Sequence, residues 1–215
     1  MKKLLTPIKI RDLEVRNRIV MTAMHLNYTP DGKVNDRLVA FYEERSKGGT
    51  GLIIVGGCII NDLAGPHWLI DMRDDSVIEG HSMLADAIKK HGTAAVCQLY
   101  HAGRYSHSIS MGGKQAVAPS AVTARLTREE PRAMSIEEIK QTVRDYAEAA
   151  VRIKKAGYDA VEVLACTGYL INQFMSPVTN LRDDEYGGSW ENRIRFGLEV
   201  ADAVGGEPPT PKELA

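Results

Sequence analysis

The sequence predicts an α/β protein of the (β/α)8-barrel type, in which about the first four βα units are present behind an N-terminal hairpin that serves as a lid. Apolar runs typical of strands covered on both faces alternate with helical segments, which indicates parallel strands joined by right-handed crossovers. No G-x-G-x-x-G motif follows any of these runs, so a dinucleotide-binding open sheet is disfavoured. The chain has 215 residues, whereas a complete barrel usually needs about 250.

The predicted elements follow from apolar periodicity and from residues that start and stop helices. In chain order they are a hairpin over residues 8–15, a strand over 18–24, a helix over 35–47, a strand over 51–55, a helix over 76–91, a strand over 94–100, a helix over 136–156, a strand over 159–164, a short helix over 170–175 and a helix over 189–204. We therefore expect residues 1–204 to be the N-terminal half of a barrel and residues 205–215, which are rich in glycine and proline, to be an irregular tail.

Local signals justify the elements of the first two units. Residues 8–15 alternate with period two around a polar turn, which is typical of a hairpin, and Gly48-Gly49 ends the first helix. In the second unit we expect Ser76 to be the N-cap of the helix, with Glu79 completing a capping box and Gly92 as the stop.

Similar signals define the third and fourth units. The connection after residue 100 is polar and runs to about Met134, and a loop of that length inside a compact domain is usually functional. Ser135 and Glu138 form a capping box that starts the next helix. The apolar residues of this helix fall on one stripe, which consists of Ile136, Ile139, Val143, Tyr146, Ala147, Ala150 and Ile153.

The composition is that of a soluble globular protein, and we expect a cytoplasmic location. Hydrophobic residues make up 44% of the chain and charged residues 26%, with 27 Lys+Arg against 28 Asp+Glu. This balance gives neither the basic footprint of a nucleic-acid-binding protein nor a polyanionic tail. The apolar runs are far shorter than the roughly 20 residues of a membrane span, and the N-terminus lacks the apolar region of a signal peptide.

Cysteine usage predicts no metal site and no disulfide framework. Cys58, Cys97 and Cys166 stand far apart without a C-x-x-C pair, so they cannot assemble a zinc ribbon or an iron–sulfur cluster. We expect each to be a small apolar residue, buried or half-buried, rather than a reactive thiol.

Unusual residues follow all four predicted strands, where the reacting groups of (β/α) barrels lie. Taken singly, each has an ordinary structural explanation. Gly56-Gly57 fits turn geometry as well as the approach of a flat ligand, Gln98 is more often a satisfied structural amide, and His25 and His101 are more often capped or half-exposed than catalytic. Their coincidence at successive strand ends favours a functional site.

Several ordered motifs over residues 4–204 resemble the old yellow enzyme family of FMN-dependent oxidoreductases. The motifs are Asn17–Met21 with Met24, Gln98–Arg104, Gly157–Glu162, Gly168–Phe174 with Ser176-Pro177, and Asn180–Ser189 followed by Glu191–Arg193. The resemblance implies FMN as cofactor, NAD(P)H as reductant and a small unsaturated molecule as substrate. The charge balance and the short apolar runs predict neither a nucleic acid nor a membrane as partner.

The resemblance also implies roles for individual residues. The cofactor-binding residues are Thr22, Ala23, Met24 and His25 under the isoalloxazine, Gly57 where only a small residue admits the ring, and Gln98 against the pyrimidine edge. Hydride passes from flavin N5 to an electron-poor carbon of an activated alkene, and Tyr169 donates the proton, since a phenol with the ordinary pKa near 10 stays protonated at neutral pH. The matched polar residues Arg182, Asp183, Glu185, Asn192 and Arg193 are expected to brace the loop after the fourth strand, with Pro177 fixing its turn.

Within the family, the sequence looks most like the 2,4-dienoyl-CoA reductase and 2-enoate reductase branch. Many members carry a histidine and an asparagine or second histidine five and two residues before the tyrosine, where they hold a substrate carbonyl oxygen. Leu164 and Thr167 occupy these positions here, so this pair is missing, as in the dienoyl-CoA branch. His25 also matches that branch.

The family supplies the phosphate grip for FMN from the loops after the seventh and eighth strands, which follow the residues matched here. We therefore expect a truncated product or half of a split one, which pairs with a second copy or with a separate C-terminal half if it is stable. An alternative function is a catalytically silent half-barrel that does not retain flavin. A flavin-free aldolase or isomerase is disfavoured, because no strand-end lysine is evident for Schiff-base chemistry.

Overall fold

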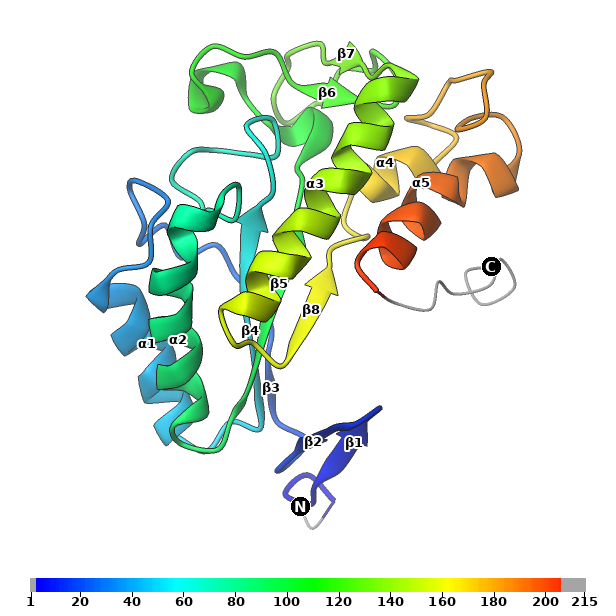
Figure 1. The fold of residues 1–215 in the computed structure, drawn as a ribbon. Helices are drawn as coiled ribbons and strands as arrows, with labels where there is room; N and C mark the ends of the chain where they lie inside the picture. Colours follow the sequence, from blue (N-terminus) through cyan, green and yellow to red (C-terminus); the bar gives the residue numbers. More distant parts are fainter. Residues whose placement is uncertain (1–2, 206–215) are drawn as a thin grey trace. The chain divides into compact units, whose positions relative to one another are not determined.

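The computed structural model describes residues 3–205 of the chain (Figure 1). The chain divides into two compact units, which we describe in turn. The first unit contains the described residues up to Cys58 together with 68–99 and 149–162, and the second contains 59–67, 100–148 and the residues from 163 onward. The predicted irregular tail lies outside the described residues from position 206 on. Among residues 3–205, no helix is long and apolar enough to cross a membrane.

A four-stranded sheet in the order β3-β4-β5-β8 organises the first unit. Its strands are β3 (Val20–Met21), β4 (Leu52–Ile59), β5 (Ala94–Tyr100) and β8 (Ala160–Val163). Strands β3 and β4 pair in parallel, and the arrows of β4, β5 and β8 point the same way in Figure 1. Every residue of β4 and β5 is buried, as the continuous apolar runs predict for strands covered on both faces.

The predicted hairpin is confirmed as β1 (Ile8–Ile10) and β2 (Leu13–Val15), which pair antiparallel with Ile8 opposite Val15. Val15 is buried in a cluster with residues from the beginnings of β4 and β5, and Ile8 and Leu13 pack against this cluster. In Figure 1 the hairpin lies at the end of the sheet where the strand arrows begin. The hairpin therefore covers the N-terminal ends of the strands.

Helices α1 (Asp36–Lys47) and α2 (Ile78–Lys89) pack against each other in the first unit. The Asn35 side chain caps α1 by accepting a hydrogen bond from the Leu38 amide, as the helix start predicted at this residue requires. Arg16 donates hydrogen bonds to four groups that lie near the ends of α1 and α2 or just before β4 and β5. They are the carbonyls of Ser46, Thr50 and His91 and the hydroxyl of Thr93. No motif or periodicity in the sequence indicates that this arginine joins the four groups.

The prediction that Ser76 caps the second helix is wrong. The Asp74 carboxylate accepts a 2.8 Å hydrogen bond from the Ser76 amide and caps a single 3-10 turn, η1 (Asp75–Val77), and α2 begins only after this turn. A carboxylate at the N-terminus of a turn is a strong acceptor, so Asp74 takes the position expected for Ser76. Glu79 consequently lies in the first turn of α2 and completes no capping box. Gly92 has the left-handed φ of +78° expected of a residue that ends the helical segment.

The first strand is also shorter than predicted. Only Val20 and Met21 pair with β4, opposite Leu52 and Ile53, and the chain leaves the sheet edge after them. The strand predicted over 51–55 instead continues to Ile59.

Helix α3 (Ile136–Lys155) contributes residues to both units, and its predicted capping box is confirmed. The Glu138 amide donates to Ser135 Oγ at 3.2 Å, and the Ser135 amide donates to Glu138 Oε2 at 2.8 Å. The Arg132 guanidinium beside Glu138 lowers the pKa of this carboxyl to about 2. Ile139, Tyr146, Ala150 and Ile153 of the predicted stripe are buried.

The second unit contains the short pieces of the long polar connection and the last two helices. These elements are η2 (Gly103–Tyr105), η3 (Ser108–Met111), β6 (Val117–Ala118), β7 (Arg132–Ala133), α4 (Leu170–Met175) and α5 (Trp190–Ala203). Strands β6 and β7 pair in parallel inside the connection that was predicted to be a loop. Helices α4 and α5 pack together through Phe174 and Phe196, whose ring centroids lie 4.6 Å apart.

The cysteine predictions hold for two of the three residues. Cys58 and Cys97 are buried free thiols with their sulfur atoms 3.3 Å apart, and burial raises the pKa of Cys97. Cys166 is exposed, so the expectation that it is buried or half-buried is wrong. It lies in the loop between β8 and α4, where the chain has left the sheet.

We expect His81 to make the stability of the first unit sensitive to acid. The ring is buried, Nε2 donates to the Asp71 carbonyl at 3.0 Å, and Nδ1 therefore accepts from the Tyr158 hydroxyl at 3.1 Å. Burial lowers the pKa of His81 from 6.5 to about 4, so the unfolded chain binds more protons between these values. We expect the free energy of unfolding to fall by about 3 kcal/mol as the pH falls from about 6.5 to about 4.

Urea unfolding at several pH values, followed by Trp68 fluorescence in a Trp190→Phe background, measures this dependence in the first unit. Glutamine can donate and accept at the same positions, so His81→Gln is expected to flatten the pH dependence, whereas His107→Gln on the surface leaves it intact. An unchanged pH dependence in His81→Gln would contradict the assignment to this ring.

Candidate functional site

The six predicted cofactor-binding residues all belong to the first unit. Thr22, Ala23, Met24 and His25 directly follow β3, Gly57 lies in β4, and Gln98 lies in β5. These three strands are neighbours in the sheet, and each of the six residues lies toward the end of its strand or just beyond it. The parallel arrangement therefore brings together the residues that the sequence motifs associate with one ring.

The segment after β3 offers a mixed surface of apolar and polar side chains. Met24 is 44% exposed, Thr22 and His25 are exposed, and Ala23 packs against the cluster that contains Leu52 and Ile54. Desolvation by the surrounding protein lowers the pKa of His25, which favours the neutral imidazole. A neutral ring beside exposed apolar atoms suits contact with an uncharged aromatic system.

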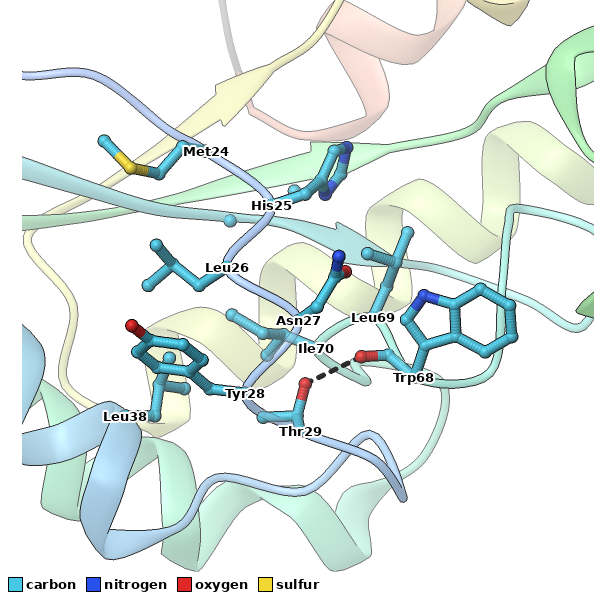
Figure 2. A pocket seen from close by; sticks show the side chains of 12 residues that line it. Met24, His25, Leu26, Asn27, Tyr28, Thr29, Leu38, Trp68, Leu69 and Ile70 are labelled. Carbon is cyan, nitrogen blue, oxygen red and sulfur yellow. Dashed lines mark hydrogen bonds between the residues drawn. The ribbon is translucent and has the colours of Figure 1, made fainter.

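The loop that carries His25 is held to neighbouring segments by hydrogen bonds (Figure 2). Thr29 Oγ1 donates to the Trp68 carbonyl at 2.8 Å, and Asn35 Nδ2 donates to the Tyr28 carbonyl at 2.7 Å. Figure 2 shows Tyr28 beside Leu38 of α1, whereas Met24 and His25 point away from Leu38. The hollow under this loop measures about 10 Å³, room for roughly one water molecule, so it is too small to hold a flavin ring.

Gly56 is required by close packing of β4 against Gln98. Its φ of +146° is a conformation that other residues rarely adopt. A Cβ atom at this position would lie 2.9 Å from Gln98 Cβ and 3.0 Å from the Gln98 carbonyl oxygen. The first glycine of the Gly56-Gly57 pair is therefore explained by packing, because the absence of a side chain lets β4 approach Gln98 this closely.

The side-chain amide of Gln98 contacts a carboxylate on the neighbouring strand. Gln98 is 8% exposed, and its Nε2 donates a hydrogen bond to Glu162 Oε1 on β8, the next strand of the sheet. Among the described residues, no partner contacts Gln98 Oε1, so the carbonyl remains available to a ligand. Glu162 was not singled out in the sequence, although an acidic residue inside the apolar strand Ala160–Val163 was the signal that could have identified it.

Tyr169, the predicted proton donor, lies in the second unit as the residue before α4. Its ring is half-buried and meets the rings of Tyr100 and Tyr105 edge-on, with centroid distances of 4.7 and 6.0 Å. Burial raises the pKa of Tyr100, and a hydrogen bond with Tyr169 adds to this effect, so Tyr100 retains its proton. A Cβ atom at Gly168 would lie 2.6 Å from Tyr105 Oη, so the glycine before Tyr169 lets this aromatic cluster form.

A larger hollow of about 450 Å³ adjoins this cluster within the second unit. Tyr105 lines the hollow and contacts Tyr169, so the ring of the predicted proton donor neighbours a space that could hold a small organic molecule. The other lining residues are Arg104, Val122, Thr123, Arg125, Leu126 and Val178.

His101 has a structural role, as expected for a single histidine at a strand end. The ring is buried, Nδ1 accepts a hydrogen bond from the Gly103 amide at 3.0 Å, and burial lowers the pKa to about 3. It therefore stays neutral and stabilises the turn that begins η2.

The polar brace predicted after the fourth strand is confirmed for Arg182, Asn192 and Arg193, with Asp184 as an additional residue, whereas the parts assigned to Asp183, Glu185 and Pro177 stay predictions. Arg182 forms an ion pair with Asp184 and donates hydrogen bonds to the carbonyls of Pro119 and Met134. Arg193 donates to the carbonyls of Met175 and Gly188, and Asn192 donates to the Asp184 carbonyl. Asp184 was part of the quoted motif but was not assigned this role.

Comparison with known proteins places the chain in a family. Residues 3–207 match the model of the NADH:flavin oxidoreductase / NADH oxidase family. The chain is 49% identical over 204 residues to a metal reductase of Desulforamulus reducens, covering 95% of this chain and 30% of the relative. It is 41% identical over 210 residues to an NADPH dehydrogenase of Bacillus subtilis, covering 94% of this chain and 60% of the relative.

A solved structure of morphinone reductase in complex with tetrahydroNAD is 36% identical, with a TM-score of 0.89, and the match covers 98% of this chain and 62% of that one. The chain thus spans about 30% to 60% of the length of the curated relatives it matches. The fold predicted from the sequence, part of a (β/α) barrel, is confirmed by this likeness. The chain belongs to the NADH:flavin oxidoreductase / NADH oxidase family, which includes the old yellow enzymes and uses FMN with NAD(P)H as reductant.

Proposed function

We propose that this chain provides the isoalloxazine-binding residues and the proton donor of an FMN-dependent oxidoreductase that reduces activated C=C bonds of enoate, enoyl or dienoyl type with NAD(P)H. The observation that carries the proposal is the Gln98 side chain, a buried amide at a strand end whose carbonyl has no partner among the described residues. Such a group leaves one acceptor and one N–H donor for a heterocycle edge that carries the complementary pair.

The other five residues complement this amide. Thr22, Met24 and His25 offer an exposed surface on which a flat ring can lie, Ala23 supports them from the core, and Gly57 adds no side chain. When bound, FMN supplies the two-electron chemistry that takes hydride from NAD(P)H and delivers it to an electron-poor carbon. The protein contributes the contacts that hold and orient the ring.

Tyr169 contributes the proton under this proposal. Its half-buried phenol lies against Tyr100, whose retained proton can donate a hydrogen bond to the Tyr169 oxygen. This hydrogen bond stabilises the charge that develops on Tyr169 as its proton leaves, which is the task of a partner to a general acid. The hollow lined by Tyr105 offers space for the substrate.

Flavin uptake tests the proposal directly. The purified chain is titrated with FMN, and bound flavin is followed by its visible absorption and by the change in its fluorescence. We expect saturable uptake, and we expect Gln98→Leu to bind FMN about tenfold more weakly because one or two hydrogen bonds are lost. A chain that takes up no FMN would contradict the proposal and favour the catalytically silent half-barrel.

Three further properties expected from the sequence stay predictions. Residues 1–204 are expected to be the N-terminal half of a barrel, with a cytoplasmic location and with a second copy or a C-terminal half as partner. Sedimentation of the purified chain checks the last of these, and a well-folded monomer would contradict it.

A further inference from the structure

We infer that Glu162 is a positioning residue for cofactor recognition, because it sets which way the Gln98 amide faces. This inference rests on the proposed function, since it assigns the orientation of the amide that would meet the pyrimidine edge of FMN. The two side chains come from neighbouring strands, β8 and β5, and Gln98 Nε2 donates to Glu162 Oε1.

A carboxylate can only accept hydrogen bonds, so Glu162 determines the orientation of the amide. The NH₂ group of Gln98 must face Glu162, and Oε1 must face the other way. A glutamine without such a neighbour can turn its amide by half a rotation at little cost, which exchanges its donor and acceptor. Glu162 removes this ambiguity and leaves the carbonyl and the second N–H of Gln98 in a fixed arrangement.

That arrangement complements the pyrimidine edge of a flavin, which carries an N–H donor at N3 next to carbonyl acceptors. The Gln98 carbonyl suits the N3–H group, and the remaining Gln98 N–H suits a carbonyl. The position of the amide is itself restricted, since Gln98 is 8% exposed and β4 passes against it at Gly56. Position and orientation are therefore both set in the protein before a ligand arrives, which lowers the cost of binding.

Glu162 lacks the partners that a structural carboxylate in this chain has. Asp159, directly before the same strand, pairs with Lys89 at 2.7 Å and accepts a hydrogen bond from the Ala95 amide. Among the described residues, the contact recorded for Glu162 is the amide of Gln98, with no Lys, Arg or His within ion-pair distance. A half-buried carboxylate without a cation also places negative charge near the proposed ring, which opposes the addition of electrons to it.

The experiment compares Glu162→Gln with Asp159→Asn in the full chain. Both variants remove one negative charge at or directly before the same strand at constant size, and circular dichroism verifies that they fold. We expect Glu162→Gln to weaken FMN binding about tenfold and to shift the midpoint potential of bound FMN in the positive direction, because the amide is free to turn and a nearby charge is lost. Asp159→Asn should leave the FMN affinity and the midpoint potential as in the wild type.

The outcomes separate the two proposals. Wild-type chain that binds no FMN overturns the proposed function and this inference with it. Wild-type chain that binds FMN while Glu162→Gln binds it equally well, at the same midpoint potential, overturns the inference alone.

A double variant distinguishes orientation from simple loss of a hydrogen bond. Gln98→Glu combined with Glu162→Gln restores an amide–carboxylate pair with its polarity reversed, so residue 98 presents acceptors only. We expect this variant to unfold at the wild-type temperature and still to bind FMN at least about tenfold more weakly, because flavin carbonyls then face an acceptor. Wild-type FMN affinity in the double variant would show that orientation is irrelevant and would overturn the inference.

Discussion

Under the proposed function, replacing Tyr169 with phenylalanine is expected to slow alkene reduction by about 10²–10⁴-fold, the range that a positioned general acid contributes. The substitution removes the hydroxyl but keeps the ring that packs edge-on against Tyr100 and Tyr105. Reduction of bound flavin by NAD(P)H needs no proton from this side chain, so its rate should stay close to that of the wild type. Stopped-flow absorption of the flavin separates the two half-reactions, with cinnamate and 2-cyclohexenone as trial alkenes.

Tyr105→Phe is the matched control for Tyr169→Phe. Tyr105 lies in the same cluster, with its ring centroid 6.0 Å from that of Tyr169, and losing its hydroxyl should change neither half-reaction more than a few-fold. Equal alkene-reduction rates in Tyr169→Phe and the wild type would remove Tyr169 from the mechanism. Slow flavin reduction in Tyr169→Phe would instead indicate that the ring cluster itself had been disturbed.

The boundaries of helices and strands were predicted correctly where a single local sequence signal sets them. The strand over 94–100 and the short helix over 170–175 have their predicted boundaries, because both are bounded by polar or glycine residues. The start of α2 was predicted wrongly because two capping residues compete there, and Asp74 takes the Ser76 amide two residues before the expected start. The first strand was too long because its length depends on pairing with β4, which no local pattern encodes.

The site was predictable where the resemblance assigned a residue its own role, and not where a residue of a matched motif acts through a neighbour in space. The sequence order of the strands indicated that Gln98 and the segment after β3 belong to one unit. It did not reveal Glu162, because the contact with Gln98 joins residues 64 positions apart. Tyr100 was missed for a similar reason, since its role depends on the ring of Tyr169, which follows a different strand.

Removing the guanidinium of Arg182 is expected to cost about 3–5 kcal/mol of the free energy of unfolding of the second unit, as for other broken buried ion pairs. The Arg182 side chain is only 10% exposed, and its Nε lies 3.0 Å from Asp184 Oδ1. It also donates to the carbonyls of Pro119 and Met134 at 3.0 and 2.6 Å. In Arg182→Met the apolar stem is kept, but two carbonyls and a carboxylate lose their donors.

Urea unfolding followed by Trp190 fluorescence in a Trp68→Phe background measures this loss in the second unit, where Trp190 begins α5. Arg132→Met is the matched control, because Arg132 also holds a carboxylate with two hydrogen bonds, to Glu138, but its side chain is 45% exposed. Water replaces the lost donor there, so the expected cost is at most about 1 kcal/mol. Equal losses of unfolding free energy in Arg182→Met and Arg132→Met would contradict the view that burial, rather than the ion pair itself, makes Arg182 the main brace of its loop.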